Sequence, residues 1–144
     1  MTKVKHLRLT LYLAGSSKEL KYREYIENKY RWDFLLLNPL NISREESLEQ
    51  IGNNEHNTFL VRRDKKMILS SDIVIVYIGE TGQASWGTAM EIEFAYSNGV
   101  PVYVIDESID KQSHDVWIKF HAKKIFSGID ECFDWLLSDN KVGL

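Results

Sequence analysis

Residues 72–78, Asp-Ile-Val-Ile-Val-Tyr-Ile, narrow the choice of fold more than any other segment of the chain. β-Branched residues fit the pleated surface of a strand, and the run lacks the polar–apolar alternation of a half-exposed strand. Both faces of this strand should therefore be covered by other parts of the protein. Strands of this kind occur in parallel sheets that carry helices on both sides. The segment predicts a central strand of an α/β domain.

Strand-like and helix-like segments alternate along the rest of the chain. Strand patterns occur at residues 6–14, 34–37, 102–105 and 124–126, and helical spacing of apolar residues occurs at 20–31, 57–69, 88–98 and 129–137. We also expect a short helix at 43–51, another that ends at Phe120, and a cap at Ser127 for the last helix. The alternation predicts a doubly wound, mostly parallel five-stranded sheet with helices on both faces, of flavodoxin or Rossmann type. The 144 residues fit a single domain spanning 1–144.

Composition excludes several classes of partner. A net charge of -3 with scattered lysines and arginines argues against binding to nucleic acid polymers. No apolar run approaches the roughly 20 residues that cross a bilayer, so no membrane segment is expected. The lone Cys132 excludes an internal disulfide and fits the cytoplasm, and alternation at residues 7–14 favours a strand over a secretory signal. The histidines show no metal-ligand spacing, so neither a metal nor another cofactor is expected.

Three segments should meet at the carboxyl-terminal edge of the sheet, where ligands bind in open α/β folds. They are residues 12–16, 79–87 and 87–91. Gly15, Ser16 and Ser17 could cradle a phosphate with backbone N–H groups, or could simply cap the next helix. The chain contains neither GxxxxGK[ST] nor GxGxxG, which argues against a P-loop or a standard dinucleotide site.

Glu91 and Asp64 are the carboxylates that could carry chemistry. Glu91 is expected in the first turn of its helix, where the macrodipole would keep it ionised and suited to act as a nucleophile. The alternative is a solvated helix glutamate favoured by the same dipole. Asp64 could likewise be one exposed charge among basic neighbours, and Asp72 could cap the turn before its strand.

Taken in order, the motifs resemble those of the nucleoside 2-deoxyribosyltransferase family. The resemblance covers the first strand through about Ile105 and is carried by three stretches. These are Leu11-Tyr12-Leu13-Ala14-Gly15-Ser16, then Asp64, Ile68 and Asp72 at steps of four, then Gly87-Thr88-Ala89-Met90-Glu91-Ile92 with Ala95 and Gly99-Val100-Pro101-Val102.

The resemblance implies a set of roles for these residues. Glu91 would attack the anomeric carbon of a 2'-deoxynucleoside and hold a covalent deoxyribosyl intermediate, which another free base then accepts. Tyr12 would orient Glu91, and Asp64 would hydrogen-bond or protonate the departing base. Gly87 and Thr88 of the same motif would lie at the substrate.

Ser85 departs from the family pattern, because the transferases usually carry an aspartate six residues before the nucleophile. A carboxylate there would repel a 5'-phosphate, whereas serine would not. The chain resembles in this respect the deoxynucleoside 5'-monophosphate N-glycosidases of the same superfamily, which are hydrolases. Ser85 with Gly15, Ser16 and Ser17 could then form a phosphate pocket.

Members of the family usually form dimers or larger homo-oligomers with shared active sites. The corresponding stretch here, which includes His114, matches neither branch of the superfamily well. Two alternatives to an enzyme therefore stay open. One is a non-catalytic nucleotide-sensing module, and the other is an unrelated flavodoxin-like signalling domain.

Overall fold

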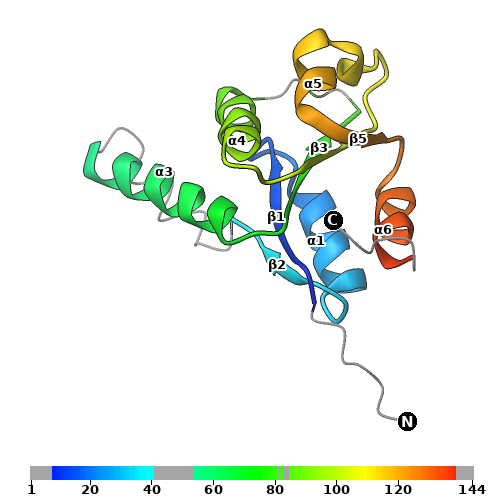
Figure 1. Ribbon diagram of the computed structural model, residues 1–144, viewed down its shortest axis with the longest axis horizontal. Coiled ribbons are helices and arrows are strands. Elements are labelled where there is room, and N and C mark those ends of the chain that lie inside the picture. Colours follow the sequence, from blue (N-terminus) through cyan, green and yellow to red (C-terminus); the bar gives the residue numbers. More distant parts are fainter. Residues whose placement is uncertain (1–7, 41–53, 81, 83–84, 139–144) are drawn as a thin grey trace.

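The computed structural model describes residues 8–40, 54–80, 82 and 85–138. Within these ranges strands and helices alternate along the chain (Figure 1). The elements, in order, are β1 (Thr10–Gly15), α1 (Leu20–Tyr30), β2 (Leu35–Leu37), α3 (Asn54–Leu69), β3 (Ile73–Ile78), α4 (Trp86–Ser97), β4 (Val102–Asp106), the 3-10 turn η1 (Gln112–His114), α5 (Val116–His121), β5 (Ala122–Phe126) and α6 (Ile129–Leu137).

The strands form a five-stranded sheet in the order β2-β1-β3-β4-β5, and every neighbouring pair is parallel. The segment expected to be central is β3, which lies between β1 and β4 and pairs Ile75 with Leu13 and with Tyr103. Its residues are buried except Tyr77, which is partly exposed. The predicted mostly parallel α/β sheet of flavodoxin type is confirmed.

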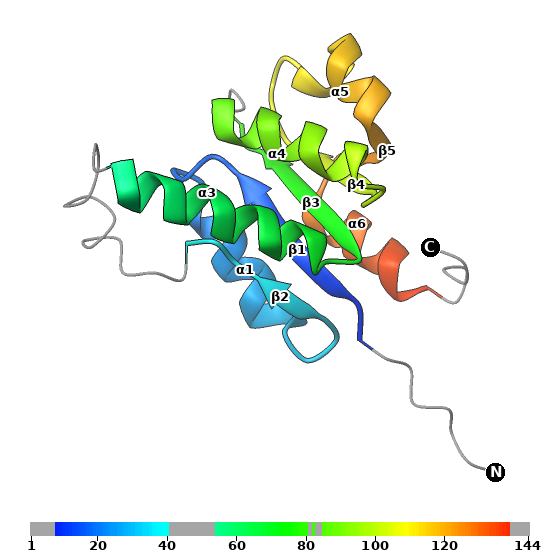
Figure 2. The ribbon, with the colours of Figure 1, turned by 60° about the vertical axis from the view of Figure 1, so that its left-hand side comes forward.

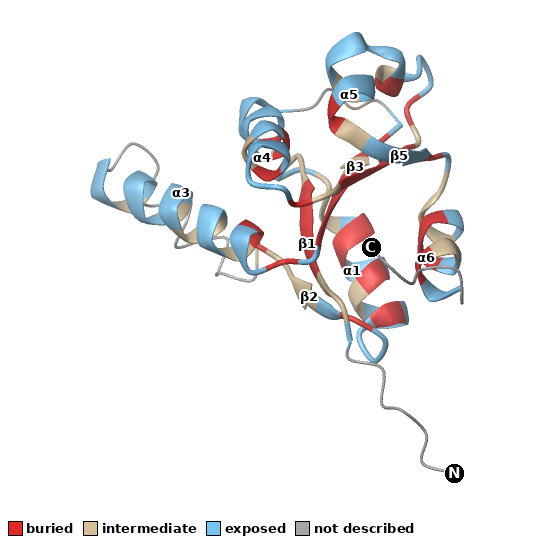
Figure 3. Cartoon of the chain, in the orientation of Figure 1, coloured by how far each residue is buried: buried red, intermediate tan, exposed pale blue. Residues whose placement is uncertain are grey.

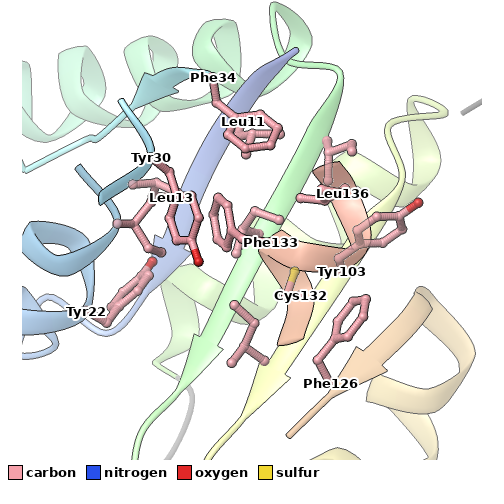
Figure 4. Packing of buried hydrophobic residues seen from close by; sticks show 14 residues of the cluster. Leu11, Leu13, Tyr22, Tyr30, Phe34, Tyr103, Phe126, Cys132, Phe133 and Leu136 are labelled. Carbon is pink, nitrogen blue, oxygen red and sulfur yellow. The ribbon is translucent and has the colours of Figure 1, made fainter. Parts of the chain in front are cut away.

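Helices cover both faces of the sheet, as predicted (Figures 1 and 2). Alternate residues of each strand point to opposite faces, and the two sets are buried against different helices. On one face, side chains of β1, β3 and β4 pack against α1 and α6, with Phe133 stacked on Tyr30 and in edge contact with Phe34 (Figure 4). The other face packs against α3 and α4. Among the described elements, the three inner strands β1, β3 and β4 are therefore the most buried (Figure 3).

The alternation along β1 determines which side chains reach the site. Leu11 and Leu13 belong to the cluster under α1 and α6, whereas Tyr12 and Ala14 belong to the cluster under α3 and α4. Tyr12 therefore faces the helix that carries Glu91.

Several predicted helix ends differ from the structure. α6 begins after Gly128 and not after Ser127, whose N–H bonds to the Glu131 carboxylate at 3.2 Å. α1 has Glu19 at its N-cap without a side-chain cap, so the serines before it do not cap it; Ser16 Oγ accepts from the N–H of Lys18 at 3.3 Å. α4 begins at Trp86, earlier than expected.

The predicted helix at 43–51 lies outside the described residues, as do the first two residues of the predicted strand 6–14. Among the helices that the structure describes, none combines the length and apolar character needed to cross a membrane.

Candidate active site

Tyr12 and Glu91 are in direct contact across the gap between β1 and α4. The Tyr12 hydroxyl donates a hydrogen bond to Oε2 of Glu91. Tyr12 is fully buried in the sheet, and parallel pairing with Leu37 on β2 and Val74 on β3 fixes its backbone. The two residues are far apart in sequence, so their contact depends on the fold. The structure thus brings together the expected nucleophile and the residue expected to orient it.

Glu91 is a partly buried carboxyl group and not a solvated helix glutamate. Burial raises its pKa to about 7, against the opposing effect of the Tyr12 hydrogen bond; Asp64 raises the pKa further, and Arg23 and Arg63 lower it. This differs from the expectation that the macrodipole would keep Glu91 fully ionised. Since α4 begins at Trp86, Glu91 lies in the second turn, where the dipole effect has faded and desolvation dominates.

Tyr12 keeps its proton under all ordinary conditions. Burial raises the pKa of its phenol well above the usual value, and the Glu91 and Asp64 carboxylates add to this effect. The hydroxyl is therefore a permanent donor to Glu91. A protonated donor favours the ionised form of the carboxylate that it contacts and also fixes its orientation.

Asp64 lies on α3 and is held by its neighbour Arg63. Arg63 binds Oδ1 of Asp64 through Nε at 3.0 Å and Nη2 at 2.8 Å, and Nη2 also donates to the carbonyl of Pro39 at 2.7 Å. The side chain of Asp64 is only 27% exposed, so the expectation of a freely exposed charge is wrong. Burial raises the pKa of Asp64, although Arg63 opposes the rise. Its charge acts on both Tyr12 and Glu91, which places it near that pair.

Ser85 is the N-cap of α4. Its Oγ accepts a hydrogen bond from the N–H of Thr88 at 3.1 Å and lies 2.9 Å from the Thr88 hydroxyl. Thr88 is buried, whereas Ser85 and Gly87 are exposed. Ser85 and Gly87 therefore sit at the open end of the helix that carries Glu91, and the capping bond occupies one lone pair of the Ser85 hydroxyl.

Gly15 ends β1 in a conformation that favours glycine, with φ +145°. A Cβ at this position would lie 3.1 Å from the carbonyl oxygen of Tyr77 and 3.3 Å from the ring of Tyr22, so little space remains for a side chain. Ser16 is partly buried and Ser17 is exposed. The turn is thus a narrow backbone segment that begins where β1 ends.

His114 and Asp72 lie apart from the Tyr12–Glu91 pair. His114 is an exposed residue of η1, which packs on α5 and β4, and the described contacts do not join it to Glu91. Asp72 precedes β3 at the opposite, amino-terminal edge of the sheet, where its carboxylate accepts from the N–H of Thr10 at 2.7 Å. It holds β1 to β3 and is remote from the site.

Arg23 is a buried residue of this region that sequence reasoning missed. It lies on α1, is 2% exposed, and donates to backbone carbonyls around the end of β1. Its charge lowers the pKa of Glu91, Asp64 and Tyr12. The one signal in the sequence is its place between Tyr22 and Ile26 on the apolar side of a helix.

Two hollows of the described surface lie away from Glu91. One of about 610 Å³ follows α3 and includes Arg63, and one of about 650 Å³ lies at the amino-terminal edge of the sheet near Asp72 and His121. The candidate site is therefore defined by the contacts of Glu91. Within the described ranges, no group of three or more histidine, cysteine, aspartate or glutamate side chains could hold a metal ion.

The fold and these contacts define a class: a flavodoxin-like α/β domain with a partly buried carboxyl group that accepts a hydrogen bond from a tyrosine of its first strand. No model of a known protein family matches the chain, and no curated protein sequence does. The chain is similar in structure to a 2-deoxyribosyltransferase from Bacillus psychrosaccharolyticus, with a TM-score of 0.66, 23% identity, and coverage of 85% of this chain and 89% of that one. It is also similar to the CMP N-glycosidase BcmB of Clostridium botulinum, with a TM-score of 0.54, 18% identity, and coverage of 88% and 96%. The fold expected from the motif resemblance is thus confirmed.

The raised pKa of Glu91 predicts that Glu91→Gln stabilises the protein at alkaline pH. A carboxyl group whose pKa rises on folding contributes stability at low pH, and this contribution is lost as the pH rises toward 7. Glutamine mimics the protonated form and can still accept from Tyr12. We expect Glu91→Gln to raise the free energy of unfolding on the order of 3 kcal/mol at pH 8 and by less than about 1 kcal/mol at pH 5. Urea unfolding followed by circular dichroism measures both values.

Glu93→Gln is the matched control for this experiment. Glu93 is an exposed residue of the same helix, and hydrogen bonds from Ser97 and His121 lower its pKa. Removing its charge should therefore not stabilise the protein at pH 8. A Glu91→Gln variant that is no more stable than the wild type at pH 8 would show that Glu91 is not desolvated.

Proposed function

We propose that the protein cleaves the N-glycosidic bond of 2'-deoxynucleosides and transfers the deoxyribosyl group to another base, with Glu91 as nucleophile. The observation that carries this proposal is the hydrogen bond from the buried Tyr12 hydroxyl to Glu91. Glu91 is a fixed, partly buried carboxyl group with a pKa near 7. Groups with pKa values shifted in this way are typical of catalytic sites, although their burial lowers the stability of the protein. The structural likeness to a 2-deoxyribosyltransferase supports the choice of reaction.

The proposed reaction has two displacement steps. An ionised Glu91 oxygen forms an ester bond to C1' of the sugar while the bond from C1' to the base nitrogen breaks, and the departing base takes a proton. In the second step a nitrogen of another base attacks C1' and loses its proton, and the ester to Glu91 breaks. A 2'-deoxy sugar lacks the electron-withdrawing 2'-hydroxyl, so its oxocarbenium-like transition state forms readily.

Asp64 supplies and recovers the proton in this proposal. Its raised pKa suits a proton donor, and Arg63 fixes its carboxyl group through two hydrogen bonds. The first step needs an ionised Glu91 oxygen, and Asp64 would pass the proton that the departing base takes up. The two carboxyl groups affect each other, because the charge of Asp64 raises the pKa of Glu91.

A second candidate function is hydrolysis of the N-glycosidic bond of deoxynucleoside 5'-monophosphates, and Ser85 favours it. Ser85 and Gly87 are exposed at the amino-terminal end of α4. A serine hydroxyl can donate a hydrogen bond to a phosphate there, and the positive end of the helix dipole attracts it, whereas an aspartate would repel it. The turn formed by Gly15, Ser16 and Ser17 would contribute backbone N–H groups. The fold of the CMP N-glycosidase BcmB is compatible with this candidate. Water would then replace the acceptor base.

Self-association is a further part of the proposed function. The exposed side chains of α4 and α5 include large apolar ones, among them Trp86, Met90, Val116, Trp117 and Phe120. The motif resemblance implies an oligomer whose subunits share active sites. His114 lies two residues before the start of α5. A neighbouring subunit docked on this surface would therefore bring its own η1 region toward the helix that carries Glu91.

Incubation of each deoxynucleoside and each 5'-monophosphate, with and without a second base, tests the reaction. We expect base exchange, which chromatography of the products detects. For Glu91→Gln we expect kcat to fall by more than about 1,000-fold, because the amide is not a nucleophile. With a pKa near 7 for Glu91, kcat/KM should be about tenfold lower at pH 6 than at pH 8. Base release from monophosphates without exchange would identify the hydrolase. Binding without turnover, or near-normal turnover by Glu91→Gln, would contradict the proposed mechanism.

Ser85→Asp separates the two candidate substrates. Aspartate also caps helices, so α4 should stay intact while the added charge repels a 5'-phosphate. We expect the ratio of kcat/KM for monophosphates to that for nucleosides to fall by at least about tenfold. Ser85→Asn, an uncharged cap, is the control and should keep the ratio. Equal ratios in both variants would argue against a phosphate site beside Ser85.

Trp117→Lys tests the association surface. Trp117 is 73% exposed on α5, so the substitution should leave the fold intact and weaken association by introducing a charge into an apolar contact. Sedimentation velocity should show a shift toward the monomer. Trp32→Lys is the control, because Trp32 is 78% exposed outside this surface. An oligomer unaffected by Trp117→Lys would place the interface elsewhere.

A further inference from the structure

Arg23 is a buried cation whose hydrogen bonds go to backbone carbonyls. Nη1 donates to the carbonyls of Ser16 at 3.0 Å and Glu19 at 3.1 Å, and Nη2 donates to those of Gly15 at 3.0 Å and Leu13 at 3.4 Å. The guanidinium also lies over the ring of Tyr22, 4.8 Å from its centre. One side chain thus binds four backbone carbonyls between the end of β1 and the start of α1.

A buried charge without a carboxylate partner is costly. Among the described ion pairs none includes Arg23, although its side chain is almost fully removed from water. Backbone dipoles compensate part of this cost. The remaining positive charge acts on its surroundings through an interior of low dielectric constant, where interactions reach further than at the surface.

The ionisable groups around Glu91 come from three elements. Tyr12 approaches from β1, Asp64 and Arg63 approach from α3, and Arg23 acts from α1. Arg63 already makes two hydrogen bonds to Asp64, so much of its charge is compensated there. Arg23 has no such partner and is the cation whose field is free to act on the Tyr12–Glu91 pair.

We infer that Arg23 is a positioning residue of this site: its four hydrogen bonds fix the backbone from Leu13 to Glu19, at the end of the strand that carries Tyr12, and its buried charge acts on Glu91 from there. The inference rests on the proposed function only for the reaction that Glu91 performs. Lysine cannot replace both actions, because an ammonium group is a point charge that lacks the planar fork needed to reach four carbonyls. The two actions can therefore be separated by mutation.

Arg23→Lys and Arg23→Gln, studied without substrate, test this inference. The Glu91 carboxyl is titrated by carbon NMR, assigned with Glu91→Gln, and amide exchange of residues 16–19 is followed by mass spectrometry. For Arg23→Gln we expect the midpoint of the Glu91 titration to rise by about one pH unit. We also expect amide exchange of residues 16–19 to accelerate by at least about tenfold. For Arg23→Lys we expect the exchange to accelerate similarly while the Glu91 midpoint stays near that of the wild type. If Arg23→Gln does not fold, Arg23→Lys alone decides.

Lys21→Gln is the matched control, since Lys21 is an exposed cation on the same helix. It should change neither measurement. An unchanged Glu91 titration in folded Arg23→Gln, or wild-type exchange in Arg23→Lys, would overturn the inference. A wild-type protein without turnover would contradict the proposed function while leaving this test intact. In an active protein, the acid limb of kcat/KM should move with the Glu91 titration.

Discussion

The hydrogen bond between Tyr12 and Glu91 is the interaction on which the candidate site depends. It joins the middle of a buried strand to the second turn of a helix, so it exists only when β1, β3 and α4 are packed in register. Tyr12 points toward α4 because alternate residues of β1 face opposite sides of the sheet. The position of the carboxyl group is thereby a consequence of the sheet itself, and a slip of β1 by one residue would remove it.

Burial and ionisation oppose each other at this carboxyl group. Desolvation raises the pKa of Glu91 to about 7, whereas the Tyr12 hydroxyl and the two arginines act to keep the charged form accessible. In the proposed mechanism Glu91 would be the nucleophile and Asp64 the proton donor. The two arginines have different partners: Arg63 pairs with the Asp64 carboxylate, whereas Arg23 donates to backbone carbonyls. The balance of these groups suits chemistry near neutral pH.

The sequence predicted the fold well because its strongest signals are local. The β-branched run 73–78 and the alternating leucines of β1 specified strands. The Tyr12 hydroxyl is in contact with Glu91, the residue that the motif resemblance expected it to orient. The helical position of Glu91 was misjudged because the Ser85 cap starts α4 at Trp86, two residues before the expected start at Thr88. Arg23 was missed since its burial depends on carbonyls that converge only after β1 and α1 pack. Tertiary contacts of this kind leave no local pattern in a sequence.

The proposed ester between Glu91 and C1' of the sugar can be detected directly. Acid quenching during turnover of a deoxynucleoside, followed by peptide mapping with mass spectrometry, measures this directly. We expect a peptide that contains Glu91 and carries one deoxyribosyl group, and no such adduct in Glu91→Gln. Rapid turnover in which a deoxyribosyl adduct maps to another residue would show that Glu91 is not the nucleophile.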